Sequence, residues 1–181
     1  MGFTRLSFRY VRYLDFDTGR QLTAEEVRTK PSYEIFPLYI DAMLPTSGES
    51  ARVHLGFVPP DEPLLAHVFT EEGSRTWAII DGTKVAMPTP DILLAMKLNA
   101  VVGRTDDHKR LKDVCDIAAL GLFSGTDTNE LLDDAKRHCD ETKLKTLQQV
   151  VGEDELDKAM TVLNIERGMM RSVFNRLLTG L

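Results

Sequence analysis

The stretch that decides the fold runs from Thr89 to Leu120 and reads TPDILLAMKLNAVVGRTDDHKRLKDVCDIAAL. Its apolar residues recur at the spacing of an α-helix on both sides of Gly103. Thr89 is a favourable N-cap, and Pro90 stands in the first turn, where a missing N–H is tolerated. We therefore predict two helices, the first ended by Gly103 in a left-handed conformation and the second ended by Gly121.

The polar residues of this stretch form a dense charged set. They follow the order K-L-x-A-x-x-x-R and then K-D-x-x-D, and they are Lys97, Arg104, Lys112, Asp113 and Asp116. Residues three or four apart lie on the same side of a helix, so the last three charges crowd one part of its surface. The usual interpretation of such a pattern is a solvated face with intrahelical ion pairs. The order of these residues favours a functional site instead.

The residues before Thr89 have the alternating apolar pattern of β-strands. Strands are predicted at 6–10, 33–44, 51–58 and 64–70, and the segments around Asp81-Gly82 are predicted to form a hairpin. A short helix is predicted at 24–29, because Thr23 and Glu26 have the spacing of a capping box. We expect five or six strands in this half, mostly antiparallel or mixed.

After Gly121 the pattern is helical, with helices expected at about 126–139, 141–151, 153–163 and 165–178. The last of them has a stripe of large apolar residues, namely Met169, Met170, Val173, Phe174, Leu177 and Leu178. This stripe is either core or a surface for a partner protein or a second copy. The sequence therefore predicts an α+β fold, with a mixed sheet in 1–88 and a helical region in 89–181 packed on it.

Composition places the chain among ordinary globular proteins. Of its 181 residues 43% are hydrophobic, enough for a sizeable core, and the net charge of −6 gives no general affinity for nucleic acid or anionic membranes. No signal peptide or apolar run of membrane-spanning length is visible, so we expect a cytoplasmic protein without a membrane partner. Cys115 and Cys139 fall in helical patterns and need no disulfide, and Cys115 is predicted to lie in the core.

An acid–apolar–acid triplet, Asp15-Phe16-Asp17, follows the first predicted strand. On an extended chain these two carboxylates point to the same side, where they repel unless a cation joins them. Oxygen ligands of this kind suit Mg²⁺, so the triplet is a candidate metal site. The alternative is structural, because Asp17-Thr18-Gly19 is also a plain turn sequence.

The run P-x-x-x-L-A-M-K-L-x-A-x-x-x-R, followed by K-D-x-x-D-I-x-x-L, resembles a segment of nucleotidyltransferase-like toxins of the AbiEii/AbiGii type. The resemblance is good over Val85 to Leu120, fair over the preceding strands and undetectable after about Thr126. It implies a member of the nucleotidyltransferase superfamily that transfers a nucleotide from a nucleoside triphosphate to RNA or to a protein hydroxyl. It also implies that Asp15 and Asp17 hold Mg²⁺ and act in catalysis.

The resemblance further implies a nucleotide-binding role for the charged set. Lys97 would neutralise the phosphates, and Arg104 and Lys112 would hold an acceptor or triphosphate oxygens. Asp113 and Asp116 would orient these basic groups. The structural alternative is that both carboxylates simply pair with lysines of their own helix, Lys109 and Lys112.

The superfamily has a third carboxylate on a strand after its D-x-D, where this chain has His54. Imidazole can serve as a metal ligand or a base, so His54 is a candidate catalytic residue. The alternative is that His54 and His67 are two histidines of a sheet face that are hydrogen-bonded or solvated. Asp41, on the preceding predicted strand, is another candidate for the missing acid.

The superfamily also has a Gly-Ser or Gly-Gly pair before its D-x-D, whose backbone N–H groups hold the phosphates. No such pair precedes Asp15, so the element is either lost or lies upstream of this sequence. We therefore expect weak or absent transfer activity in this form. The alternative function is a non-enzymatic interaction or adaptor protein that keeps the scaffold and binds a partner or itself through the C-terminal helices.

Overall fold

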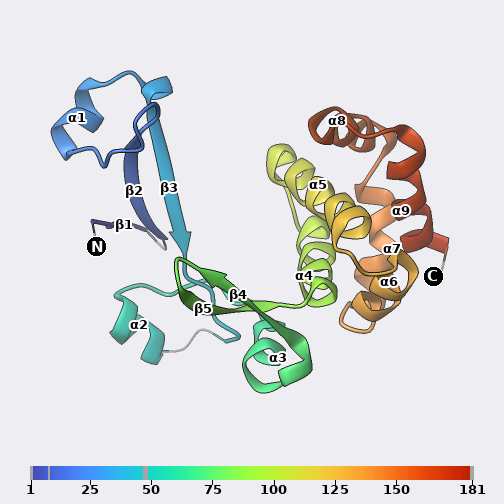
Figure 1. Cartoon of the computed structure of the whole chain (residues 1–181). Coiled ribbons are helices and arrows are strands. Elements are labelled where there is room, and N and C mark those ends of the chain that lie inside the picture. Colours follow the sequence, from blue (N-terminus) through green and yellow to red (C-terminus); the bar gives the residue numbers. More distant parts are fainter. Residues whose placement is uncertain (1, 8, 47–48, 180–181) are drawn as a thin grey trace. The chain divides into compact units, whose positions relative to one another are not determined.

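The computed structural model describes residues 2–7, 9–46 and 49–179 (Figure 1). Its strands are β1 (Thr4–Leu6), β2 (Arg9–Asp15), β3 (Ile35–Asp41), β4 (Arg75–Ile80) and β5 (Thr83–Pro88). Its α-helices are α1 (Ala24–Thr29), α2 (Glu49–Leu55), α3 (Leu65–Thr70), α4 (Pro90–Val102), α5 (Asp107–Phe123), α6 (Thr128–Lys136), α7 (Glu141–Val150), α8 (Glu153–Leu163) and α9 (Arg167–Thr179). Strands fall in the first half and helices fill the second, so the predicted α+β class is confirmed.

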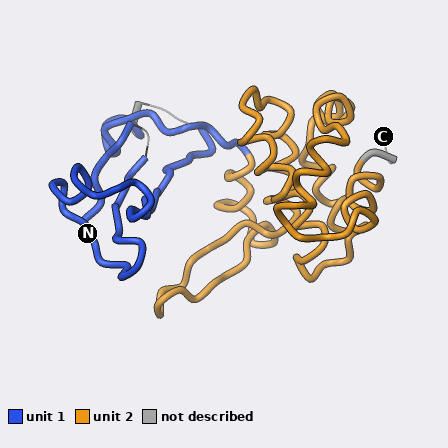
Figure 2. The backbone as a smooth tube through the Cα atoms, turned by 90° about the horizontal axis from the view of Figure 1, so that it is seen from above, with its two compact units in different colours: residues 1–63 blue, residues 64–181 orange. Residues whose placement is uncertain are grey.

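The chain forms two compact units, residues 1–63 and 64–181 (Figure 2). The first contains an antiparallel sheet in the order β1-β2-β3, where Val11 of β2 faces Thr4 on one side and Tyr39 on the other. Among its described residues, Val11, Leu22 and Pro59 are buried. The predicted capping box of α1 is present, because the Thr23 hydroxyl accepts the Glu26 N–H and the Glu26 carboxylate accepts the Thr23 N–H.

The strand predicted at 6–10 is divided between two strands. Leu6 ends β1 and Tyr10 belongs to β2, and between them Ser7 has a φ of 57°. This left-handed conformation interrupts an extended chain and reverses its direction. Phe8, a member of the predicted alternation, lies outside the described residues.

Two further predicted strands are helices, so the predictions at 51–58 and 64–70 were wrong. The first segment forms α2 and the second forms α3. Short apolar runs fit either period, and in α3 the single buried residue, Val68, stands four residues after Leu64, at helical spacing. Val53, whose alternation with Leu55 supported a strand, is 72% exposed.

The predicted hairpin is confirmed. β4 and β5 pair antiparallel, with Ile80 opposite Thr83 across Asp81-Gly82. Both turn residues have positive φ, 48° and 76°, as a type I′ turn requires. The hairpin belongs to the unit 64–181, so the compact units divide at residue 63 rather than at the predicted boundary of residue 88. The described strands thus form two antiparallel sheets and not one mixed sheet.

The core of the unit 64–181 lies among its helices. α4 and α5 pack against each other, α4 contacts α6 and α7, and α5 contacts α8 and α9. The apolar stripe of α9 lies in this core, since Met170, Val173, Phe174 and Leu177 are buried. Met169 is 40% exposed, and the side chain of Leu178 lies outside the described part of the chain. Cys115 is buried as predicted, and both cysteines are free.

The ends of α4 and α5 differ from the prediction. Gly103 has a φ of −87° and is not left-handed. The Gly103 N–H donates to the Ala100 carbonyl and the Arg104 N–H donates to the Val101 carbonyl, so bonds of the 3₁₀ type close the helix instead. Gly121 does not end α5, which continues to Phe123. A Cβ at Gly121 would lie 2.8 Å from Cγ1 of Val173, so this glycine allows α5 and α9 to approach closely.

Along the described ranges, no helix is long and apolar enough to cross a membrane.

Candidate functional site

Four of the predicted site residues meet between α4 and α5. The Lys97 ammonium lies 3.2 Å from the Asp113 carboxylate and 2.6 Å from that of Asp116, and Arg104 Nε donates to Asp113 at 2.7 Å. We call these four residues the Lys97 cluster. Lys97 stands on α4, Arg104 follows its end, and the two aspartates lie three residues apart on one side of α5. The helix pairing predicted from the Thr89–Leu120 stretch thus brings this set together.

Asp113 is the centre of the cluster. Its side chain is 3% exposed, whereas those of Lys97 and Arg104 are 31% and 38% exposed. A buried carboxylate is costly unless it is paired and hydrogen-bonded, and here one oxygen accepts from Lys97 and the other from Arg104. The structural alternative was that the two aspartates pair with Lys109 and Lys112 of their own helix. In the structure Asp113 and Asp116 pair with Lys97 of α4, and Asp113 also pairs with Arg104.

The charges of the cluster hold Lys97 protonated. Partial burial alone would lower the pKa of Lys97, but the hydrogen bond to Asp116 and the charges of Asp116 and Asp113 outweigh burial. The net result is a pKa raised above the ordinary value of 10.5. A lysine with a raised pKa is a fixed cation, able to bind an anion but unsuited to act as a general base.

A pocket of about 360 Å³ opens beside the cluster. Its walls are mostly apolar, and Lys97 and Asp116 supply the charged part of its lining. The other lining residues are Leu93, Ala119, Leu120, Phe123 and Ser124. An apolar pocket with a few converging polar groups is the usual form of a small-molecule site. Lys112 is exposed and does not line this pocket.

The aspartates of the D-x-D triplet have different surroundings. Asp15 ends β2, its Oδ1 accepts from the N–H and hydroxyl of Thr18, and its Oδ2 lies 2.9 Å from Lys30 Nζ. The hydrogen bond from Lys30, and after it those from Thr18, hold the pKa of Asp15 well below its usual range. Asp17 is exposed in the turn that follows. The turn alternative therefore describes the local structure, and Lys30 occupies the place of a cation beside Asp15.

This arrangement does not offer Mg²⁺ a ready pair of carboxylates. Both oxygens of Asp15 already accept hydrogen bonds, so a metal would have to displace Lys30. Within the described ranges, no group of three or more His, Cys, Asp or Glu residues is placed to hold a metal ion.

Of the two candidates for the third acid, Asp41 lies on a strand as predicted and His54 does not. His54 is exposed on α2 instead of on a strand, because the segment is helical. Asp41 ends β3 and pairs with Arg9 at 3.0 Å. His67, on α3, lies 2.7 Å from Glu71 and contacts the ring of His138 edge to face.

The predicted site residues belong to both compact units. Asp15, Asp17 and His54 lie in the unit 1–63, and the Lys97 cluster lies in the unit 64–181. The structure brings together Lys97, Arg104, Asp113 and Asp116 within their unit. The metal-binding and catalytic roles that the resemblance implies for Asp15, Asp17 and His54 stay predictions.

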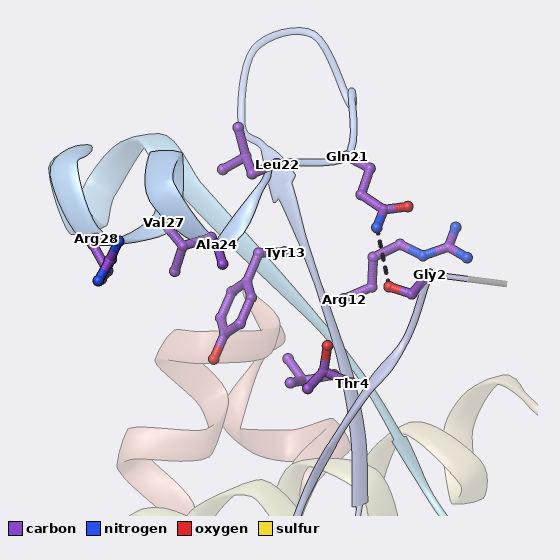
Figure 3. A pocket seen from close by; sticks show the side chains of 10 residues that line it. Gly2, Thr4, Arg12, Tyr13, Gln21, Leu22, Ala24, Val27 and Arg28 are labelled. Carbon is purple, nitrogen blue, oxygen red and sulfur yellow. Dashed lines mark hydrogen bonds between the residues drawn. The ribbon is translucent and has the colours of Figure 1, made fainter.

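The unit 1–63 has a pocket of its own, of about 480 Å³, between β2 and α1 (Figure 3). Buried Val11 and Leu22 contribute to its lining together with Tyr13. Arg28 lies to the left of Tyr13 in this view and Arg12 lies to its right (Figure 3). The Arg12 guanidinium lies 4.4 Å from the centroid of the Phe3 ring, and Arg28 pairs with Glu25 of α1, so both cations already have partners.

Sequence reasoning missed two features of these sites. Lys30, the partner of Asp15, was hidden because it lies fifteen positions away and its approach depends on how the chain folds back after α1. Phe123 and Ser124 line the pocket beside Lys97 because α5 continues through Gly121. In the sequence, only the apolar residues Leu122 and Phe123 after Gly121 indicated that the helix continues.

No family model, curated protein or solved structure gave a significant match to this chain.

Proposed function

We propose that this chain is a nucleotidyltransferase-like protein of the cytoplasm, in which the Lys97 cluster serves the phosphates of a nucleoside triphosphate. Turnover in this form is slow or absent. The observation that carries the proposal is the Lys97 ammonium, held at the charged edge of an apolar pocket by two carboxylates. The order of residues from Val85 to Leu120, which resembles AbiEii/AbiGii-type toxins, supplies the reaction class.

In this proposal Arg104 holds an acceptor or triphosphate oxygens. Lys97 contacts phosphate oxygens, Asp113 positions Lys97 and Arg104, and Asp116 holds the ammonium at the pocket. The apolar walls would take the flat face of a base. The acceptor would be an RNA or protein hydroxyl, and Asp15 with Asp17 would bind Mg²⁺ once Lys30 is displaced.

The weakness of the site follows from its charge balance. Two cations and two carboxylates cancel, so the cluster has no surplus positive charge for a polyanion. No glycine pair precedes Asp15 to supply backbone donors. Removing a single preorganised donor typically costs about 3 kcal/mol in a transition state, and here more than one element differs.

The test is a transfer assay with labelled nucleoside triphosphates, Mg²⁺ or Mn²⁺, and mixed RNA and protein acceptors. We expect little or no label transfer by the full chain. Robust transfer that Asp15→Ala or Asp17→Ala abolishes would contradict the proposed weakness. The matched control is Asp133→Ala, an exposed aspartate of α6 outside the proposed site.

A second candidate is a non-enzymatic interaction protein on the same scaffold. The specific observation in its favour is the exposure of large apolar side chains on strands, among them Tyr39, Ile40, Trp77 and Ile79. Four residues of the α9 stripe, Met170, Val173, Phe174 and Leu177, are buried in the core, so this candidate function would use the strands instead. Triphosphate binding that depends on Lys97 separates the two functions, because only the first requires it.

A further inference from the structure

The β4–β5 hairpin is an unusual element for a stable protein. In the described part of the chain these two strands pair only with each other. Trp77 is 48% exposed and Ile79 is 70% exposed. Isolated two-stranded hairpins are marginally stable, and an exposed apolar edge invites another strand to pair with it.

The hydrogen-bond pattern shows which backbone groups of β4 remain outward. Ile80 pairs with Thr83 at the turn, and at the other end the Thr89 N–H donates to the Ser74 carbonyl at 3.1 Å. Because bonded and non-bonded pairs alternate in an antiparallel ladder, the even-numbered residues of β4 bond to β5. The N–H and C=O groups of Trp77 and Ile79 therefore point away from β5.

The two edges of the hairpin differ. On β5 the outward positions are Lys84, Ala86 and Pro88, so a charge and a proline without N–H blunt that edge. β5 also contacts α3 and α4. On β4 no proline or charge interrupts the outward donors between Arg75 and Asp81. The outer edge of β4 is therefore the one whose backbone groups can pair with a further strand.

We propose that two copies of this chain associate through β4, antiparallel and centred on Ala78, to form a sheet in the order β5-β4-β4-β5. Such a pairing is two-fold symmetric, so each contact occurs twice. It places Trp77 opposite Ile79 of the second copy, an aromatic and β-branched pair that stabilises sheets. It also places Arg75, whose guanidinium donates to the backbone carbonyls of Val68 and Phe69, beside Asp81 of the second copy. Those bonds use one nitrogen of the guanidinium, and opposite charges then meet at both ends.

Charge complementarity selects this register. A pairing centred on Trp77 would set Arg75 against Ile79, and one centred on Ile79 would set Asp81 against Trp77. Both alternatives leave Arg75 and Asp81 without an opposite charge. Since a single strand edge buries little surface, the dimer is expected to be weak and to depend on concentration.

The first test is the mass of the full chain by light scattering over a range of concentrations. We expect the mass to rise from 20.3 kDa toward twice that value. Ile79→Pro removes an outward N–H but no β4–β5 bond, and it should keep the mass at 20.3 kDa throughout. A monomer at all concentrations, or an unchanged dimer in Ile79→Pro with native circular dichroism, would overturn the proposal.

The second test fixes the register and does not depend on the proline variant folding. Ala78 would face Ala78 of the second copy in a non-hydrogen-bonded pair, where Cβ atoms come close enough for a disulfide. Ala78→Cys should therefore form a covalent dimer with oxidised glutathione, whereas Thr76→Cys, which would face Ile80, should not. Wild-type protein reports any contribution from Cys115 and Cys139. Equal crosslinking of both variants, or none, contradicts the register.

Discussion

At the scale of single residues, Asp113 determines whether the Lys97 cluster exists. It is the buried member, and its two oxygens hold one cation from α4 and one from the loop that follows. Removing one partner of a buried ion pair leaves the others without compensation, which costs more than the pair contributes. The order of the sequence predicted which residues form the set. It could not predict that the two cations and two carboxylates of the set pair with one another, because those pairs form only when α4 and α5 approach each other.

We expect Asp113→Asn to lower the free energy of unfolding by about 3 kcal/mol, the lower end for a broken buried pair, since Lys97 and Arg104 can regain water. Urea denaturation measures the change. The matched control is Asp134→Asn, whose pair with Arg137 lies on the surface and should change stability by less than about 0.5 kcal/mol. Equal effects of the two substitutions would contradict the central position of Asp113.

The lowered pKa values of Asp15 and Glu26 predict how the free energy of unfolding depends on pH. Lys30 and Thr18 depress the pKa of Asp15, and Arg20 with Thr23 lowers the pKa of Glu26 to about 2. A carboxylate with a depressed folded pKa stabilises the fold above its unfolded value. That stability is complete above pH 4.5, the ordinary value of Glu26, and is lost as pH falls through the folded values.

Lys30→Met tests the Asp15 part of this effect together with the neighbouring pair, because Lys30 also lies 3.0 Å from Glu34. The stability difference between wild type and Lys30→Met should be larger near pH 6 than near pH 2, because Asp15 is protonated progressively at low pH. Urea denaturation at both pH values measures it. A difference that does not shrink on acidification would show that the Lys30–Asp15 pair does not stabilise the fold.

At the scale of elements, the contact between α5 and α9 depends on Gly121. The sequence predicted most helices from capping residues and period, and the hairpin from Asp81-Gly82. It failed at α2 and α3, where short apolar runs fit both periods. It also took Gly121 for a helix end, because a glycine that ends a helix and one that admits a neighbouring helix look the same in sequence.

Gly121→Ala should destabilise the protein by about 1–3 kcal/mol, because the new methyl group would overlap Val173. This loss outweighs the helix propensity of about 1 kcal/mol that alanine gains over glycine. Val173→Ala in the same chain should recover part of the loss, which a double-mutant cycle by urea denaturation measures. Strictly additive effects would contradict a direct contact.

At the scale of the whole molecule, stability is concentrated in the unit 64–181. Its helices share a continuous core, whereas the unit 1–63 buries few apolar side chains among its described residues. We expect the amides of β1–β3 to exchange with deuterium at lower free energies of opening than those of α4 and α5. Hydrogen exchange followed by mass spectrometry tests this. Equal protection in both units would contradict the uneven distribution.

In the proposed function, Lys97 binds the phosphates of a nucleoside triphosphate. The most direct measurement is the shift in thermal midpoint on adding triphosphate and Mg²⁺, each protein being compared with itself without ligand. We expect a small rise for wild type, none for Lys97→Gln, and an unchanged rise for Lys145→Gln, which alters an exposed lysine of α7. No rise in wild type, or an equal rise in Lys97→Gln, would contradict the claim.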